Sequence, residues 1–92
     1  QNDTMAVGVL SALHDLGVRV PDDCSVVGCD DIPLSTYTLP PLTTMHIPFG
    51  EIGEMTVKVL HDLITQRVTE PQKILLPTHL VSRNSSGPCT IA

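Results

Sequence analysis

Two adjacent aspartates, Asp30 and Asp31, stand directly after a short apolar run over residues 25–29. Such a run is typical of a buried strand, and in open α/β sheets ligands bind at the carboxyl ends of the strands. An ionised carboxylate only accepts hydrogen bonds, which suits the hydroxyl groups of a sugar or a ribose. Neighbouring residues of an extended chain point to opposite faces, which disfavours a catalytic pair. Three interpretations stay open: a solvated loop end, a ligand-binding carboxylate or an acid–base catalyst.

The other residues that could do chemistry show no pattern of a catalytic or metal site. The histidines lack the spacing of metal ligands: His14, His46, His61 and His79. The chain has no nucleophile-elbow pattern and no glycine-rich phosphate loop. We therefore expect no catalytic residue, no metal and no cofactor. The odd number of cysteines, Cys24, Cys29 and Cys89, disfavours a disulfide framework and favours reduced thiols in a cytoplasmic protein.

Charge and length exclude further classes of function. The 92 residues carry a formal net charge of -5, and the five basic residues are scattered along the chain. Direct binding of nucleic acid needs a basic face, so we do not expect this segment to contact DNA. No apolar stretch is long enough to span a membrane, and the sequence does not begin with a signal-peptide pattern. The length fits one domain at most.

Periodicity and turn residues predict an α/β order of elements that would carry the aspartates. Asn2 or Asp3 is a natural N-cap for the first helix, and Gly17 is a stop signal after it. The second helix has the stronger amphipathic pattern. In chain order we expect a helix over 5–16, strands over 25–28 and 42–47, and a helix over 49–65. After it we expect either two strands, over 73–76 and 79–83, or one strand bent at Pro77. Because no strand precedes the first helix, the pattern is typical of a truncated lobe.

Several sequence blocks occur in an order that closely resembles the lactose and galactose repressor family. They are Asn2-Asp3-x-Met5-Ala6-x-Gly8, Val20-Pro21-x-Asp23, Ser25-Val26-Val27-Gly28-x-Asp30-Asp31, Pro40-Pro41-Leu42-Thr43-Thr44, and Leu80-Val81-x-Arg83-x-Ser85. The resemblance runs from Asn2 to about Ser86. One departure is Cys29, which stands where the family usually has an aromatic residue.

The resemblance implies a bacterial transcriptional repressor whose effector domain has two lobes shaped like periplasmic sugar-binding proteins. Residues 1–86 would be a partial C-terminal lobe of this type I, three-layer fold, with helices packed on a mostly parallel sheet. Residues 87–92 would be a flexible tail. The implied partners are a sugar or purine-like effector, a second copy of the chain in a homodimer, and operator DNA through an absent N-terminal helix-turn-helix domain. Effector binding between the lobes would shift their closure, which is allostery.

The resemblance also assigns residues. Asn2, Asp30 and Phe49 match effector-binding positions, although Phe49 has the alternative role of packing the helix start against the sheet. Asp31 has the alternative role of bonding the backbone at the strand end. The family's dimerisation surface matches residues that also have a core alternative: Val7, Leu10, Ser11 and Tyr37. The competing function is a lobe of a secreted sugar-binding transport protein, and the three cysteines favour the repressor.

Overall fold

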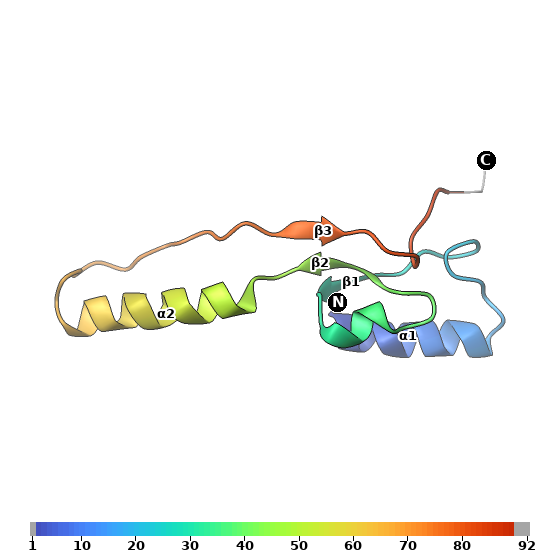
Figure 1. The fold of residues 1–92 in the computed structure, drawn as a ribbon, viewed down its shortest axis with the longest axis horizontal. Helices are drawn as coiled ribbons and strands as arrows, with labels where there is room; N and C mark the ends of the chain where they lie inside the picture. The colour runs from blue at the N-terminus through green and yellow to red at the C-terminus, as the bar shows by residue number, and fades with distance from the viewer. Residues whose placement is uncertain (1, 90–92) are drawn as a thin grey trace. The chain divides into compact units, whose positions relative to one another are not determined.

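The computed structural model describes residues 2–89, which divide into two compact units. The first unit contains the residues up to Ile47 together with those from His79 onward, and the second is Pro48–Thr78. The first unit holds α1 (Asp3–Asp15), β1 (Val27–Asp30), a 3-10 helix (Pro33–Thr36), β2 (Thr43–His46) and β3 (His79–Val81), and the second holds α2 (Phe49–Ile64) (Figure 1).

Helix α1 has the start and end signals that the sequence predicts. The side chain of Asn2 accepts a hydrogen bond from the backbone N–H of Met5 at 2.9 Å, so Asn2 is the N-cap. Gly17 follows the helix with a φ of 71°, a conformation that glycine adopts without a steric penalty. The helix packs on β1, and Ala6 and Leu10 join Val26 and Leu42 in a small buried core.

The sheet of the first unit has the strand order β1-β2-β3 and is mixed. Strands β1 and β2 are parallel, with Val27 opposite Thr43 and Asp30 opposite His46. Strands β2 and β3 are antiparallel, with His46 opposite His79. Because β1 and β2 run in the same direction, their carboxyl ends lie at one edge of the sheet. This edge carries the aspartates.

Two predicted strand boundaries and one predicted strand are wrong for physical reasons. Strand β1 starts at Val27, because the N–H of Val26 donates to the carbonyl of Ser85 at 2.8 Å instead of pairing with β2. Strand β3 ends at Val81, because the N–H of Arg83 donates to a side chain, Thr43 Oγ1, at 2.9 Å. Residues 73–76 form no strand, since a β-prone segment needs a partner strand and Leu75 is 83% exposed.

The second unit confirms the predicted second helix to within one residue. Helix α2 runs over Phe49–Ile64 with Thr65 as its C-cap, against a predicted range of 49–65. None of its residues is buried within this chain. The predicted flexible tail begins at Gly87, whose N–H donates to Ser25 Oγ at 3.2 Å, and residues 90–92 of that tail lie outside the described residues.

Candidate functional site

The start of α1 is attached to β2 and to the segment that follows β1 by a buried carboxylate. Asp3 is fully buried; its Oδ1 accepts from Thr44 Oγ1 at 2.6 Å and its Oδ2 accepts from the N–H of Ile32 at 2.9 Å. Gly28 makes this approach possible, because a Cβ at that position would lie 2.1 Å from Asp3 Oδ1. Asn2 and Asp30, which flank these contacts along the chain, are therefore held at the same edge of the sheet.

The backbone leaves β1 through two consecutive residues with positive φ. The φ of Asp30 is 122° and that of Asp31 is 61°. Aspartate tolerates the left-handed region better than most residues, but each such conformation still costs about 1–3 kcal/mol. The backbone turns here and is not extended through both aspartates, so the argument that neighbouring side chains point to opposite faces does not apply to this pair. Such strain persists only where the surroundings fix the conformation.

Hydrogen bonds of the Asp31 side chain fix this backbone conformation. Its Oδ1 accepts from Arg83 Nη2 at 2.8 Å, and its Oδ2 accepts from His46 Nδ1 at 2.8 Å. Arg83 Nη1 also donates to Ser35 Oγ at 2.8 Å and to the carbonyl of Leu42 at 2.9 Å. The hydrogen bond from Arg83 and then that from His46 lower the pKa of Asp31 below its usual value, against the opposing effect of desolvation. We call Asp31, Ser35, His46 and Arg83 the anchoring cluster.

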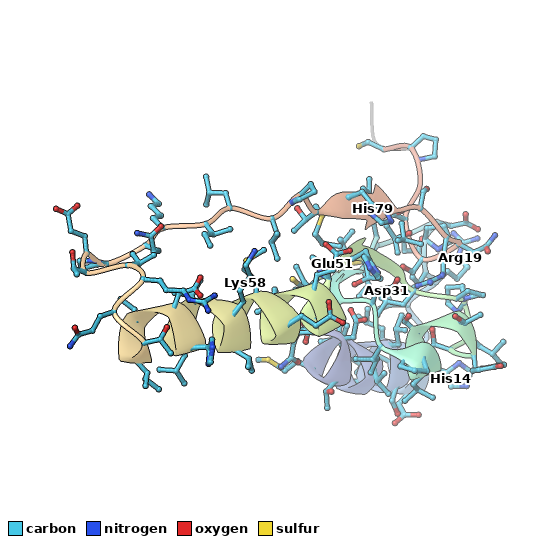
Figure 2. The ribbon with its side chains drawn as sticks, turned by 60° about the vertical axis from the view of Figure 1, so that its left-hand side comes forward. His14, Arg19, Asp31, Glu51, Lys58 and His79 are labelled. Atoms are coloured by element: carbon cyan, nitrogen blue, oxygen red, sulfur yellow. The ribbon has the colours of Figure 1, made fainter. Side chains whose placement is uncertain are left out.

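One aromatic contact extends the anchoring cluster to β3. The rings of His46 and His79 stack, with centroids 4.8 Å apart and an interplanar angle of 28°. Figure 2 labels Asp31 and His79, which both belong to the first unit. Because the ionised Asp31 carboxylate can only accept, Nδ1 of His46 carries the hydrogen, and its Nε2 is directed away from this bond.

Two of the three predicted effector-binding residues lie in the first unit, Asn2 as the N-cap of α1 and Asp30 as the last residue of β1. Asn2 is exposed and Asp30 is half-buried at the edge described above. Phe49 is the first residue of α2, in the second unit, and is 57% exposed. Cys29, which stands where the family has an aromatic residue, is half-buried in β1. Asp31 bonds side chains, where the sequence suggested backbone contacts at the strand end.

The predicted dimerisation residues divide into a core residue and surface residues. Leu10 is only 7% exposed and belongs to the core, so it offers little surface to a partner. Within this chain, Leu10 therefore has the alternative role, which is packing in the core. Val7 is half-buried, Ser11 is exposed, and Tyr37 is 79% exposed beside the 3-10 helix. These three side chains keep the surface that an interface requires.

The sequence analysis missed most of the anchoring cluster. His46 was considered only as a metal ligand and Asp3 only as a cap, while Arg83 and Ser35 had no assigned role. The sequence held one signal: Asp31 and Arg83 each belong to a sequence block that resembles the family pattern. Asp31 and Arg83 lie 52 positions apart, and a single sequence does not show that they meet.

Residues 2–89 contain no group of three or more histidine, cysteine, aspartate or glutamate side chains placed to hold a metal ion. Within the same range, no helix combines the length and the apolar character needed to cross a membrane.

Comparison with known proteins identifies the family. The profile described as "Periplasmic binding protein-like domain" matches residues 1–86. The ribose operon repressor of Escherichia coli (strain K12) is 45% identical over 85 residues, which are 92% of this chain and 26% of that protein. The HTH-type transcriptional repressor PurR of Vibrio parahaemolyticus is 40% identical over 84 residues, or 91% of this chain and 25% of that protein. The chain belongs to the lactose and galactose repressor family.

Solved structures of this repressor family have the same fold. A LacI family transcriptional regulator from Enterococcus faecium with bound ribose superposes with a TM-score of 0.86 at 34% identity, covering 97% of this chain and 33% of that one. The Lac repressor bound to ONPG gives a TM-score of 0.85 at 39% identity, covering 92% and 26%. The chain is thus a fragment of a periplasmic-binding-protein-like fold, as the sequence predicts. It spans about a quarter of the length of the curated relatives named above, at 26% and 25%.

Proposed function

We propose that this chain is the part of a transcriptional repressor that senses a small neutral sugar. The observation that carries the proposal is the common placement of Asn2 and Asp30 at the carboxyl edge of β1 and β2, held by the buried Asp3. In open α/β sheets this edge is where ligands bind. The proposal includes no reaction, because an effector is bound and released unchanged.

The polar groups at this edge favour hydroxyl groups in a ligand. Oδ1 of Asn2 already accepts from the N–H of Met5, so the Asn2 amide has its two N–H donors left for a ligand. The Asp30 carboxylate only accepts. A sugar hydroxyl both donates and accepts, so neighbouring hydroxyl groups satisfy both residues. The negative charge of Asp30 repels phosphate and carboxylate ligands, which argues for a neutral sugar.

The named relatives support the sugar assignment and the repressor assignment. Curated relatives are repressors by name, including the ribose operon repressor, and similar family structures are described with bound ribose or lactose. We propose that the complete protein acts in the cytoplasm as a homodimer and reaches operator DNA through a separate domain. Val7, Ser11 and Tyr37 are the residues proposed to contribute to the dimer, and Phe49 is proposed to stack on the sugar ring.

Isothermal titration calorimetry of the complete protein tests the proposal. The ligands are ribose, other aldoses, ribose 5-phosphate and adenine, and the variants are Asp30→Asn and, as a matched control, Asp15→Asn on the exposed end of α1. We expect a neutral sugar to bind and Asp30→Asn to weaken it about 10- to 100-fold, the loss typical of a hydrogen bond to a charged group. Preference for ribose 5-phosphate or adenine, or equal affinity in both variants, would contradict the proposed site.

A further inference from the structure

Asp31 accepts its two shortest side-chain hydrogen bonds, both 2.8 Å, from Arg83 and His46, and these two donors are held in different ways. Arg83 is fixed independently of Asp31, because its guanidinium also donates to Ser35 Oγ at 2.8 Å and to the carbonyl of Leu42 at 2.9 Å. In the described part of the chain, the His46 side chain makes one hydrogen bond, and it is 40% exposed. The His46 ring therefore needs a second contact to keep its orientation.

His79 supplies that second contact from the neighbouring strand. His46 ends β2 and His79 begins β3, and the two residues are directly opposite each other in the antiparallel register. Their rings stack, with centroids 4.8 Å apart. Directly opposed side chains on antiparallel strands interact, and stacked rings limit each other's rotation. His79 thus fixes the plane of the ring from which Nδ1 donates to Asp31.

The proposed effector-binding residue Asp30 lies in the same row of the sheet. Asp30 is opposite His46 across the parallel pair, so Asp30, His46 and His79 occupy successive strands in one row. Neighbouring strands are about 4.7–4.9 Å apart, so the backbones of Asp30 and His79 are about 9–10 Å apart. His46 stands between them and bonds the carboxylate of Asp31, which one peptide bond joins to Asp30. A sequence of contacts thus runs from His79 through His46 and Asp31 to Asp30.

We propose that His46 and His79 are positioning residues for effector binding. The stacked pair holds the Asp31 carboxylate, and Asp31 keeps Asp30 in the positive-φ conformation from which its carboxylate meets the effector. Such a conformation persists only where the surroundings fix it. The proposal rests on the proposed sugar-binding role of Asp30, and neither histidine has to touch the sugar. It requires a flat ring at position 79 and an N–H donor at the place of His46 Nδ1.

The requirement for a ring at position 79 is tested by isothermal titration calorimetry of the complete protein with ribose and other neutral aldoses. His79→Ser removes the ring, and His79→Phe keeps a flat ring without a charge. The matched control His61→Ser changes an exposed histidine of α2. We expect His79→Ser to weaken sugar binding about 3- to 10-fold, the range of one lost hydrogen bond. His79→Phe and His61→Ser should bind like the wild type.

The requirement for a donor at position 46 is tested by a second pair of variants. His46→Leu removes the N–H that Asp31 accepts, so sugar binding should again weaken about 3- to 10-fold. His46→Asn places an amide N–H close to the Nδ1 position, so it should bind the sugar more tightly than His46→Leu. Titrations are made below the midpoint of thermal unfolding of each variant, measured by circular dichroism, so that a loss of affinity is not a loss of fold.

The outcomes separate this inference from the sugar-binding proposal. If Asp30→Asn weakens sugar binding while His79→Ser and His46→Leu bind like the wild type, the positioning role is overturned and the sugar site stands. The positioning role is also overturned if His79→Phe binds as weakly as His79→Ser, because a stacked ring would then not explain the loss. If none of these variants, Asp30→Asn included, changes the affinity for any neutral aldose, both proposals are overturned.

Discussion

Asp31 shows how a single side chain stabilises a backbone conformation next to the proposed effector-binding residue Asp30. Its carboxylate accepts from Arg83 and His46, while its own backbone and that of Asp30 have positive φ. The side-chain bonds hold Asp31 in place, and the peptide link transmits that constraint to Asp30. We infer that Asp31 and Arg83 are positioning residues, whereas Asp30 is the group that meets the effector.

The lowered pKa of Asp31 predicts how stability depends on pH. Because the folded pKa is below the unfolded value, the stabilisation is present above about pH 4 and is lost as the pH falls through the folded pKa. Asp31→Asn should remove this part of the acid dependence. Urea unfolding of the complete protein between pH 2 and 6 measures it, with Asp15→Asn as the control. A parallel pH dependence in Asp31→Asn and the wild type would contradict the assignment.

Asn2 is predicted to have two separable roles. As N-cap it accepts from the N–H of Met5, and as a ligand group it offers its amide N–H donors. Asn2→Asp keeps a good cap but removes the donors, so we expect unchanged stability with effector affinity reduced about tenfold. Asn2→Ala should lose both, with about 1 kcal/mol of stability. Thermal unfolding and calorimetry distinguish the roles, and equal effector affinity in Asn2→Asp would contradict the ligand role.

At the scale of elements, the sequence predicts what depends on neighbouring residues in the chain. Both helices were found because the cap at Asn2, the stop at Gly17 and the apolar period are local signals. The strand predicted over 73–76 was wrong, because a strand requires a partner that no local pattern supplies. The contacts of Asp3 with Thr44 and of Asp31 with Arg83 span 41 and 52 positions, so single-sequence reasoning did not find them.

The space around each glycine predicts opposite effects for two substitutions. At Gly28 a Cβ would lie 2.1 Å from Asp3 Oδ1 and 3.0 Å from Leu42 Cδ2, both fully buried, so Gly28→Ala should destabilise by about 3 kcal/mol. At Gly53, inside α2, a Cβ meets nothing within 4 Å of it in this chain, so Gly53→Ala should stabilise by about 0.5–1 kcal/mol. Urea unfolding of both variants compares them. Equal effects would contradict the close contact at Gly28.

At the scale of the whole molecule, the fold leaves apolar side chains uncovered within this chain. Tyr37 and Leu39 are 79% and 91% exposed beside the 3-10 helix, whereas the core of the first unit contains four buried apolar residues. Large exposed apolar surfaces mark interaction sites. The proposed homodimer needs an interface, and an isologous interface uses the same patch on both copies.

The dimer proposal predicts that Tyr37→Asp dissociates the complete protein without unfolding it. An exposed side chain contributes little to the monomer's stability, while a charge placed in an apolar interface opposes association. Sedimentation velocity should show a shift from dimer to monomer, with an unchanged far-ultraviolet circular dichroism spectrum. Thr69→Asp, at an exposed loop position of the second unit, is the control and should remain dimeric. Leu10→Ala should instead lower the melting temperature, because Leu10 belongs to the core. A Tyr37→Asp variant that stays dimeric would place the interface on another face.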